Sequence, residues 1–269
     1  MRSLWIDLPA YRQIAGLEMQ TAYTYRVNLV FELLSILLRV YLLKVIWTAV
    51  YAGQGPVDGL ELREVVAFIT LAQLQVWVLS PLIADYIRER VRDGKIALDL
   101  ARPAPFLGQL LAHQVGGTLS LLPFVLLAVP LAFALGGFVP PSSVSAGLLY
   151  LLSLLLAYLV SVLMGMVIGL VSFWTLQTWG VMAIYVYVSQ FFTGALVPLA
   201  FFPPWLRSIA DVLPFQAQAF IPISLYMGQV PAHEVPRALG VQLVWVVVLF
   251  GAAWVLWQRG LRRVVIQGG

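Results

Sequence analysis

The stretch VSAGLLYLLSLLLAYLVSVLMGMVIGLV, residues 144–171, contains no Asp, Glu, Lys or Arg. A helix needs about 20 apolar residues to cross the hydrocarbon core of a bilayer, so this stretch predicts a membrane-spanning helix. The rest of the chain is similar in character: 61% of its 269 residues are hydrophobic and only 10% are charged. A water-soluble domain of about 300 residues buries only about 75% of its unfolded surface and cannot hide this much apolar surface. We therefore expect an integral membrane protein.

Five more apolar stretches have the length of a span. The third span exceeds the minimum length, and Pro123 and Pro130 are its predicted kinks. The boundary between the fourth and fifth spans is weakly marked, because residues 172–178 contain neither charge nor glycine. We expect one all-α transmembrane domain, residues 1–269, with six spans. They are residues 28–51, 65–86, 106–135, 144–171, 178–198 and 238–258.

The basic residues are distributed unevenly among the predicted loops. Most of the 16 lysines and arginines fall in the N-terminal segment 1–26, in the loop after the second span, and in the C-terminal tail. Cytoplasmic loops carry the excess of Lys and Arg, so both termini should lie in the cytoplasm and the protein in the cell (inner) membrane. The net charge of +4 does not indicate nucleic acid, because the basic residues lie between apolar runs and form no solvated basic face. Segment 1–26 predicts a cytoplasmic amphipathic helix at the interface, beginning near Asp7.

Motifs of soluble and intramembrane enzymes do not occur in the chain. Gly94-Lys95 is followed by Ile96 and lacks the partner glycine of a phosphate-binding loop. His233-Glu234 lacks the second histidine of a zinc protease, and there is no cysteine to serve as nucleophile or metal ligand. We therefore predict that the chain is not an enzyme and that it has no catalytic, cofactor-binding or metal-binding residue.

The loop YIRERVRDGKIALDLARP, residues 86–103, holds the densest cluster of charges. It predicts an amphipathic element on the cytoplasmic face, broken by the turn signal Asp93-Gly94. Its acidic residues add nothing to lipid binding, so the mixed charge favours docking to a soluble partner. A loop that binds lipid headgroups remains the alternative. With Ile87 and Val91 as apolar anchors, the predicted docking residues are Ile87, Arg88, Glu89, Arg90, Val91, Arg92, Asp93, Gly94 and Lys95.

Residues 191–228 are rich in proline and follow the fifth predicted span. Proline forbids a continuous helix there, but Pro203 to Leu213 can form a short helix with proline in its first turn. Irregular backbone at membrane depth needs cover from protein or water, which favours a half-inserted hairpin at the outer mouth. An interfacial loop with aromatic anchors is the alternative. The residues that define the predicted hairpin are Gly194, Pro198, Pro203, Pro204, Trp205 and Pro214.

The first predicted span contains Glu32, Arg39 and Lys44. Charges inside a span are costly and are candidates for function. Lys44 and Glu32 can reach the interface from the span ends, whereas Arg39 lies near the middle. Glu32 and Arg39 are therefore predicted to line a translocation path or a dimer interface.

A stripe of small residues, Ser161, Gly165 and Gly169, recurs every four residues in the fourth span. Such stripes let two helices approach closely, so we predict a packing role for it.

The segments GKIALDLARP (residues 94–103) and FFTGALVPL (residues 191–199) resemble permease subunits of type-2 ABC exporters, in the bacterial branch with uncharacterised or multidrug-type substrates. The resemblance implies a coupling helix between spans two and three and an outer re-entrant helical hairpin between spans five and six. It also implies a second permease subunit, identical or paralogous, and two copies of a cytoplasmic ABC ATPase. ATP and Mg would bind to that ATPase, and no cofactor to this chain. Membrane lipid would surround the assembly.

Two further features bear on direction and substrate. The Glu-Ala-Ala…Gly loop of many ABC importers is missing, which favours export. Few charges are available to line a cavity, which favours an amphiphilic drug-like or lipid-like substrate. The alternative is a secondary transporter or channel without an ATPase, although one glutamate within the spans is little provision for a proton or sodium site.

Overall fold

The computed structural model describes residues 8–53, 55–57, 59–137, 139–175 and 179–267. Asp7 and the boundary residues 176–178 lie outside this range. All regular elements of the described residues are α-helices or short 3-10 helices, as predicted. The longer helices are α1 (Leu8–Thr24), α2 (Arg26–Val50), α3 (Leu62–Val78), α4 (Ile83–Arg92), α6 (Phe106–Ser120), α7 (Leu122–Gly136), α8 (Val144–Leu170), α9 (Trp179–Phe192) and α12 (Val235–Gln267). The shorter ones are α5 (Ile96–Leu100), α10 (Pro204–Val212) and α11 (Phe220–Tyr226), with 3-10 turns η1 (Val171–Phe173), η2 (Leu199–Phe201) and η3 (Pro214–Ala217).

Three helical stretches of the described residues are long and apolar enough to cross a membrane: Leu62–Arg92, Val144–Phe173 and Val235–Arg263. The pair α6 and α7 makes a fourth if its 45° break is counted within one span. Helix α2 has 25 residues but contains four charged side chains, and α9 has only 14 residues. The structure thus supports several apolar helices, and the count of six spans remains a prediction.

The break in the third predicted span lies at Leu121, between α6 and α7. Pro123 occupies the first turn of α7, where its missing N–H is tolerated, and the preceding helix ends three residues before it. The predicted kink at Pro123 is therefore confirmed. Pro130 lies inside α7, and the helix continues through it.

The second predicted span, residues 65–86, is divided. Helix α3 ends at Val78, and α4 begins at Ile83 after an irregular turn that contains Pro81. The predicted coupling loop 86–103 therefore begins in the middle of a helix rather than after one. The misplacement has a local cause: residues 79–87 are mostly apolar, and one proline breaks the helix while apolarity continues into α4.

The stripe of small residues on α8 packs against this break. The Ser161 hydroxyl donates a hydrogen bond to the Leu79 carbonyl at the end of α3. A Cβ atom at Gly165 would lie 2.6 Å from Cβ of Pro81, and one at Gly169 would lie 3.0 Å from Cβ of Ile87. Only small residues allow so close an approach, which confirms the predicted packing role.

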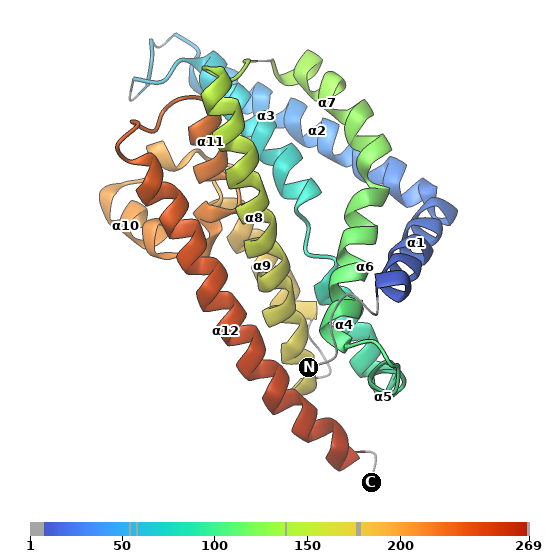
Figure 1. Cartoon of the computed structure of the whole chain (residues 1–269). Coiled ribbons are helices and arrows are strands. Elements are labelled where there is room, and N and C mark those ends of the chain that lie inside the picture. Colours follow the sequence, from blue (N-terminus) through green and yellow to red (C-terminus); the bar gives the residue numbers. More distant parts are fainter. Residues whose placement is uncertain (1–7, 54, 58, 138, 176–178, 268–269) are drawn as a thin grey trace.

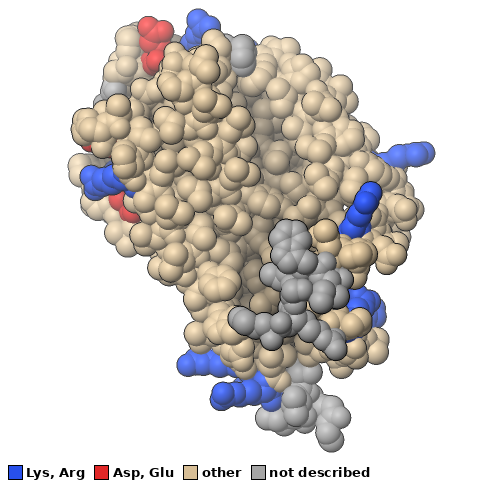
Figure 2. Space-filling model, in the orientation of Figure 1, with Lys and Arg blue, Asp and Glu red and all other residues tan. Residues whose placement is uncertain are grey.

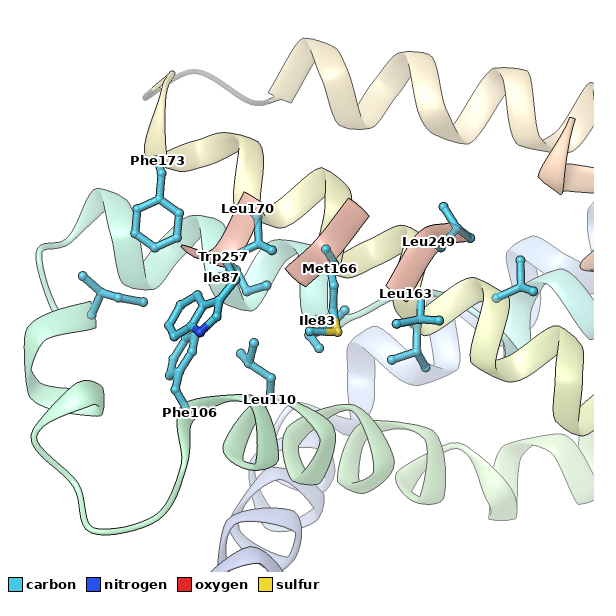
Figure 3. Close-up of a cluster of buried hydrophobic side chains, with 14 of the residues drawn as sticks. Ile83, Ile87, Phe106, Leu110, Leu163, Met166, Leu170, Phe173, Leu249 and Trp257 are labelled. Atoms are coloured by element: carbon cyan, nitrogen blue, oxygen red, sulfur yellow. The ribbon is translucent and has the colours of Figure 1, made fainter. Parts of the chain in front are cut away.

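The largest buried cluster joins α4, α6, α8 and α12 (Figure 3). Ile83, Ile87 and Leu110 are fully buried in it, and Phe106 stacks on Trp257 with ring centroids 4.8 Å apart. These contacts attach α4 to the long helices α8 and α12, which lie side by side (Figure 1).

The charged side chains lie mainly at the ends and edges of the molecule. Helices α4 and α5 and the C-terminal end of α12 lie at the lower end in Figure 1, and the α2–α3 and α7–α8 connections at the upper end. Figure 2 shows a largely uncharged face between them, with Lys and Arg at the lower end and also at the top and at both side edges, and with acidic side chains towards the upper left. The orientation with the lower end in the cytoplasm stays a prediction.

Helix α1 packs along α6 (Figure 1). The two backbones approach so closely that a Cβ at Gly116 would lie 2.5 Å from the Ala15 carbonyl oxygen. Glu18 is a charged residue within the apolar face of α1. Its carboxylate contacts His113 on α6, with 2.8 Å between Oε2 and Nε2. His113 therefore has a partner in the N-terminal helix.

Candidate functional site

The charged loop folds as two short helices, α4 and α5, which we call the coupling turn (residues 83–100). The chain reverses between them at Gly94, whose φ of +70° is costly for residues with a Cβ atom. The predicted break at Asp93-Gly94 is therefore confirmed. Ile96 is buried in the same cluster as Ile83 and Ile87, so both arms of the turn pack on the core.

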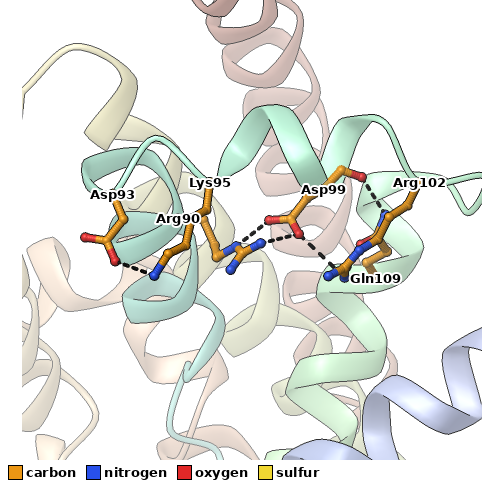
Figure 4. Close-up of polar contacts among 6 residues, drawn as sticks. All are labelled: Arg90, Asp93, Lys95, Asp99, Arg102 and Gln109. Atoms are coloured by element: carbon orange, nitrogen blue, oxygen red, sulfur yellow. Dashed lines mark hydrogen bonds and ion pairs between the residues drawn. The ribbon is translucent and has the colours of Figure 1, made fainter.

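Asp99 holds the two arms of the turn together (Figure 4). Its carboxylate is fully buried and accepts two hydrogen bonds from Arg90, both 2.5 Å long. Arg102 lies 3.5 Å from the same carboxylate, and Gln109 donates to the Asp99 backbone carbonyl at 3.0 Å. A buried charge needs this degree of pairing, because an uncompensated one is strongly destabilising. Arg90 was predicted to contact a partner protein, but in the structure its guanidinium pairs with the Asp99 carboxylate.

The apolar anchors need a correction. Ile87 is fully buried between α4 and α8, and Val91 packs against the same core. Ile83, Ile87 and Val91 recur every four residues on one face of α4, and this face points into the protein. Ile87 therefore cannot anchor a partner. Leu98 on α5, which is 66% exposed, is the apolar side chain of the turn that lies open.

The charges that remain on the outside of the turn surround Gly94. Glu89, Arg92, Asp93 and Lys95 are exposed, while Arg88 is half-buried and pairs with Asp85 at 2.7 Å. Hydrogen bonds from Lys95 and then from Arg92 lower the pKa of the Asp93 carboxyl. The exposed side of the turn therefore offers both signs of charge next to Leu98, which suits a complementary protein surface. We call Glu89, Arg92, Asp93, Lys95 and Leu98 the docking face.

A cavity of about 330 Å³ lies between α2, α3, α8 and α9. Glu32 and Arg39 both line it, as do polar side chains from the other helices. The lining is mostly apolar, and hydroxyl and amide groups are interspersed in it. They belong to Ser35, Gln73, Ser80, Ser161, Ser189, Gln190 and Gln218.

Polar contacts fix both charged residues of this cavity. Arg39 donates a long hydrogen bond, 3.4 Å, to the Gln73 side-chain oxygen. The Gln73 amide in turn donates to the Ala195 carbonyl at 2.8 Å. Glu32 accepts a hydrogen bond of 3.1 Å from the indole N–H of Trp77. Lys44 is not among the lining residues, and its amine donates to the Leu135 carbonyl at 2.5 Å.

The proline-rich segment 191–228 is irregular, as predicted. The short helix expected at Pro203–Leu213 is present as α10, Pro204–Val212. Gly194 (φ +83°) turns the chain beside Phe68, whose ring atom would lie 3.3 Å from a Cβ there. Aromatic stacking holds the segment, for example Phe201 on Trp47 at 5.0 Å. Pro198 and Pro214 are buried, whereas Pro203, Pro204 and Trp205 are exposed.

The apolar face of α10 points away from the rest of the chain. Trp205 is 66% exposed and Val212 73% exposed, whereas Ala210 on the opposite side is fully buried. Exposed apolar side chains on a short helix suit lipid or a second subunit rather than water.

Comparison with protein families matches residues 24–268 to the description "ABC-2 family transporter protein". The chain belongs to the ABC-2 transporter family. It is the permease subunit of an ABC transporter, a multi-pass membrane protein whose family works with an ABC ATPase. A comparison with curated proteins finds no match.

Family membership places the coupling turn and the cavity in a membrane subunit of a transporter. Within the described residues, no group of three or more His, Cys, Asp or Glu side chains could hold a metal ion. The docking face and the cavity lining are the two candidate functional sites of this permease.

Several important side chains were missed in the sequence. Gln73 and Gln75 are buried and donate hydrogen bonds to carbonyls of distant segments. Gln109 is buried and donates to the nearby carbonyls of Asp99 and Ala104. A lone glutamine carries no motif. The inward face of α4 did carry a signal, the four-residue spacing of Ile83, Ile87 and Val91.

Proposed function

We propose that this permease is half of an ATP-driven exporter that moves an amphiphilic drug-like or lipid-like substrate out of the cytoplasm. Two permease subunits, identical or paralogous, bind two copies of a cytoplasmic ABC ATPase, which holds ATP and Mg. Both termini and the coupling turn lie on the cytoplasmic side of the cell membrane. Residues 191–228 form a hairpin at the outer side.

The observation that carries this proposal is the construction of the coupling turn. Its docking face is exposed, while its other face is fixed to α8 through Ile83 and Ile87. The ion pair between Arg90 and Asp99 prevents the two arms from separating. A push on the docking face is therefore transmitted to α8 rather than absorbed within the loop.

The position of the cavity supports its proposed role as the path of the substrate. It lies against α2, α3 and α9, and its rim is open, since Phe31 is 64% exposed. Helix α2 also exposes a row of apolar side chains that a second permease or lipid would cover: Val30, Phe31, Leu34, Leu38, Tyr41, Leu42, Val45 and Ile46.

The test is purification of the tagged chain from its native membranes. We expect ATP-binding-cassette chains to co-purify in a ratio of two to each pair of permeases, measured by native mass spectrometry. The isolated permease should hydrolyse no ATP. A transport-competent preparation without any nucleotide-binding chain would favour the alternative, a secondary transporter or channel.

A further inference from the structure

The cavity between α2, α3, α8 and α9 contains one guanidinium group that is poorly satisfied. Arg39 has five N–H donors, and its one hydrogen bond within the described residues is the 3.4 Å contact with Gln73. No described carboxylate lies within 4 Å of it. Arg39 lies near the middle of the predicted first span, where a charge costs about 2.5–3.5 kcal/mol even when it is partly relieved, so its open donors favour binding of a counter-charge.

Glu32 does not provide that counter-charge directly. It lies seven residues before Arg39 on α2, which separates the two along the helix by about 10 Å. Its carboxylate already accepts a hydrogen bond from Trp77. Lys44 shows the contrast on the same helix, because a carbonyl oxygen at 2.5 Å satisfies its amine outside the cavity.

The surroundings of Arg39 hold its guanidinium in place. Gln73 is 1% exposed, and its amide is fixed by the Ala195 carbonyl, so its oxygen presents a defined acceptor to Arg39. The remaining N–H groups are left for another acceptor. A planar guanidinium binds carboxylate and phosphate groups through two parallel hydrogen bonds.

We propose that Arg39 binds the anionic group, a carboxylate or a phosphate, of an amphiphilic substrate. The inference rests on the proposed transport function and narrows its substrate class from amphiphiles in general to anionic ones. The apolar part of such a molecule lies against the apolar lining of the cavity, which includes Phe31, Ile36, Val76 and Met182. The volume of about 330 Å³ falls at the lower end of the range of about 300–1,000 Å³ for small-molecule sites.

The experiment measures binding of radiolabelled laurate to the full chain in nanodiscs of neutral phosphatidylcholine. Unlabelled dodecyl phosphate should compete, whereas dodecyltrimethylammonium, which has a chain of the same length, should not. Inorganic phosphate alone should compete weakly, because it lacks the apolar chain. If inorganic phosphate competed as strongly as dodecyl phosphate, the proposal that the ligand is amphiphilic would be wrong. If dodecyltrimethylammonium competed, the proposal that the ligand is anionic would be wrong.

Variants assign the binding to Arg39. Arg39→Gln should weaken laurate binding by about tenfold or more, since a hydrogen bond to a charged group is lost, and Arg39→Lys should weaken it less. Lys44→Gln is the matched control on the same helix and should bind as the wild type does. Glu32→Gln should bind equally or more tightly. Arg39→Gln with wild-type affinity would overturn the proposal. Because no ATPase is needed, laurate binding is measured even if the proposed coupling to an ATPase fails.

Discussion

The coupling turn and the hairpin at residues 191–228 are both short helices between chain breaks, but they are attached to the protein in different ways. The turn is fixed by a buried ion pair, Arg90 with Asp99, and by isoleucines in the main core (Figures 3 and 4). The hairpin is attached by stacked rings and by amide side chains of α3. Its ion pair Arg207–Asp211 lies within α10 and joins it to nothing else.

The difference shows what each region is suited to do. Charges paired in a low-dielectric site resist separation and give one defined geometry, which suits an element that transmits force. Each aromatic pair contributes only about 0.5–1.5 kcal/mol beyond its buried area, so such contacts attach a segment less firmly. The comparison predicts that equivalent changes in the two regions have very different effects.

The largest effect is expected for Asp99→Ala. The change leaves Arg90 without its partner in a site where only a fifth of its side chain is exposed, which costs about 3–5 kcal/mol. Thermal unfolding of the purified permease measures the loss. Asp93→Ala, which removes an exposed carboxylate of the same turn, is the control and should have little effect. Similar melting temperatures for the two variants would show that the buried pair does not hold the turn.

A smaller loss is expected where α8 meets the turn. Gly165→Leu places atoms where Pro81 and Ile83 already lie, and such overpacking costs about 2–3 kcal/mol. Gly251→Leu is the matched control, because a Cβ on this glycine of α12 meets open space. We expect the first variant to melt at a lower temperature and to couple ATP hydrolysis to transport poorly. Equal behaviour of the two variants would mean that α8 and α4 can separate freely.

The attachment of the hairpin should be weaker than that of the turn. Gln75 donates to the Gln218 carbonyl at 2.8 Å and accepts from the Tyr150 hydroxyl at 3.2 Å. Gln75→Leu leaves both partners unsatisfied, which costs about 1–2 kcal/mol. Hydrogen exchange should rise around Gln218 and not in the coupling turn. The exposed Gln20→Leu on α1 serves as control, and a rise in the turn instead would contradict the separate attachment of the two regions.

The smallest effect is expected on the outer face of α10. Trp205 is 66% exposed, so Trp205→Ala should change the stability of the isolated chain by less than about 0.5 kcal/mol. Ala210→Leu on the buried side of the same helix should lower the melting temperature clearly. If Trp205→Ala were the more damaging of the two, the exposed face would have to pack against the chain itself.

The sequence predicted the helix breaks in both regions, but it did not predict the contacts that hold these regions in place. Prolines and the Asp93-Gly94 pair located the breaks, since these residues restrict the backbone locally. The pairing of Arg90 with Asp99 could not be predicted, because it crosses the turn and depends on the conformation of Gly94. The amide contacts of Gln73 and Gln75 join segments more than 100 residues apart in the chain, and nothing local specifies them.

Hydrophobicity alone did not predict which apolar side chains of the coupling turn are buried. Ile87 was predicted to anchor a soluble partner, yet it lies on the inward side of the amphipathic helix α4. Leu98 is apolar and yet exposed. Its orientation follows from the way α5 folds back on α4, a consequence of the turn at Gly94 rather than of local hydrophobicity.

The most direct test of the coupling role is charge reversal on the docking face. In the double variant Arg92→Glu/Lys95→Glu, the ion pairs of Arg90 and Arg88 are untouched, so the turn should still fold and insert. The control variant, Arg259→Glu/Arg262→Glu, makes the same charge change on exposed residues of α12. The measurement is the amount of ATP-binding-cassette chain that co-purifies with each tagged permease. We expect the control to retain the wild-type amount and the docking-face variant to lose most of it. Full retention of the ATPase by the docking-face variant, with normal transport, would contradict the coupling role of this turn.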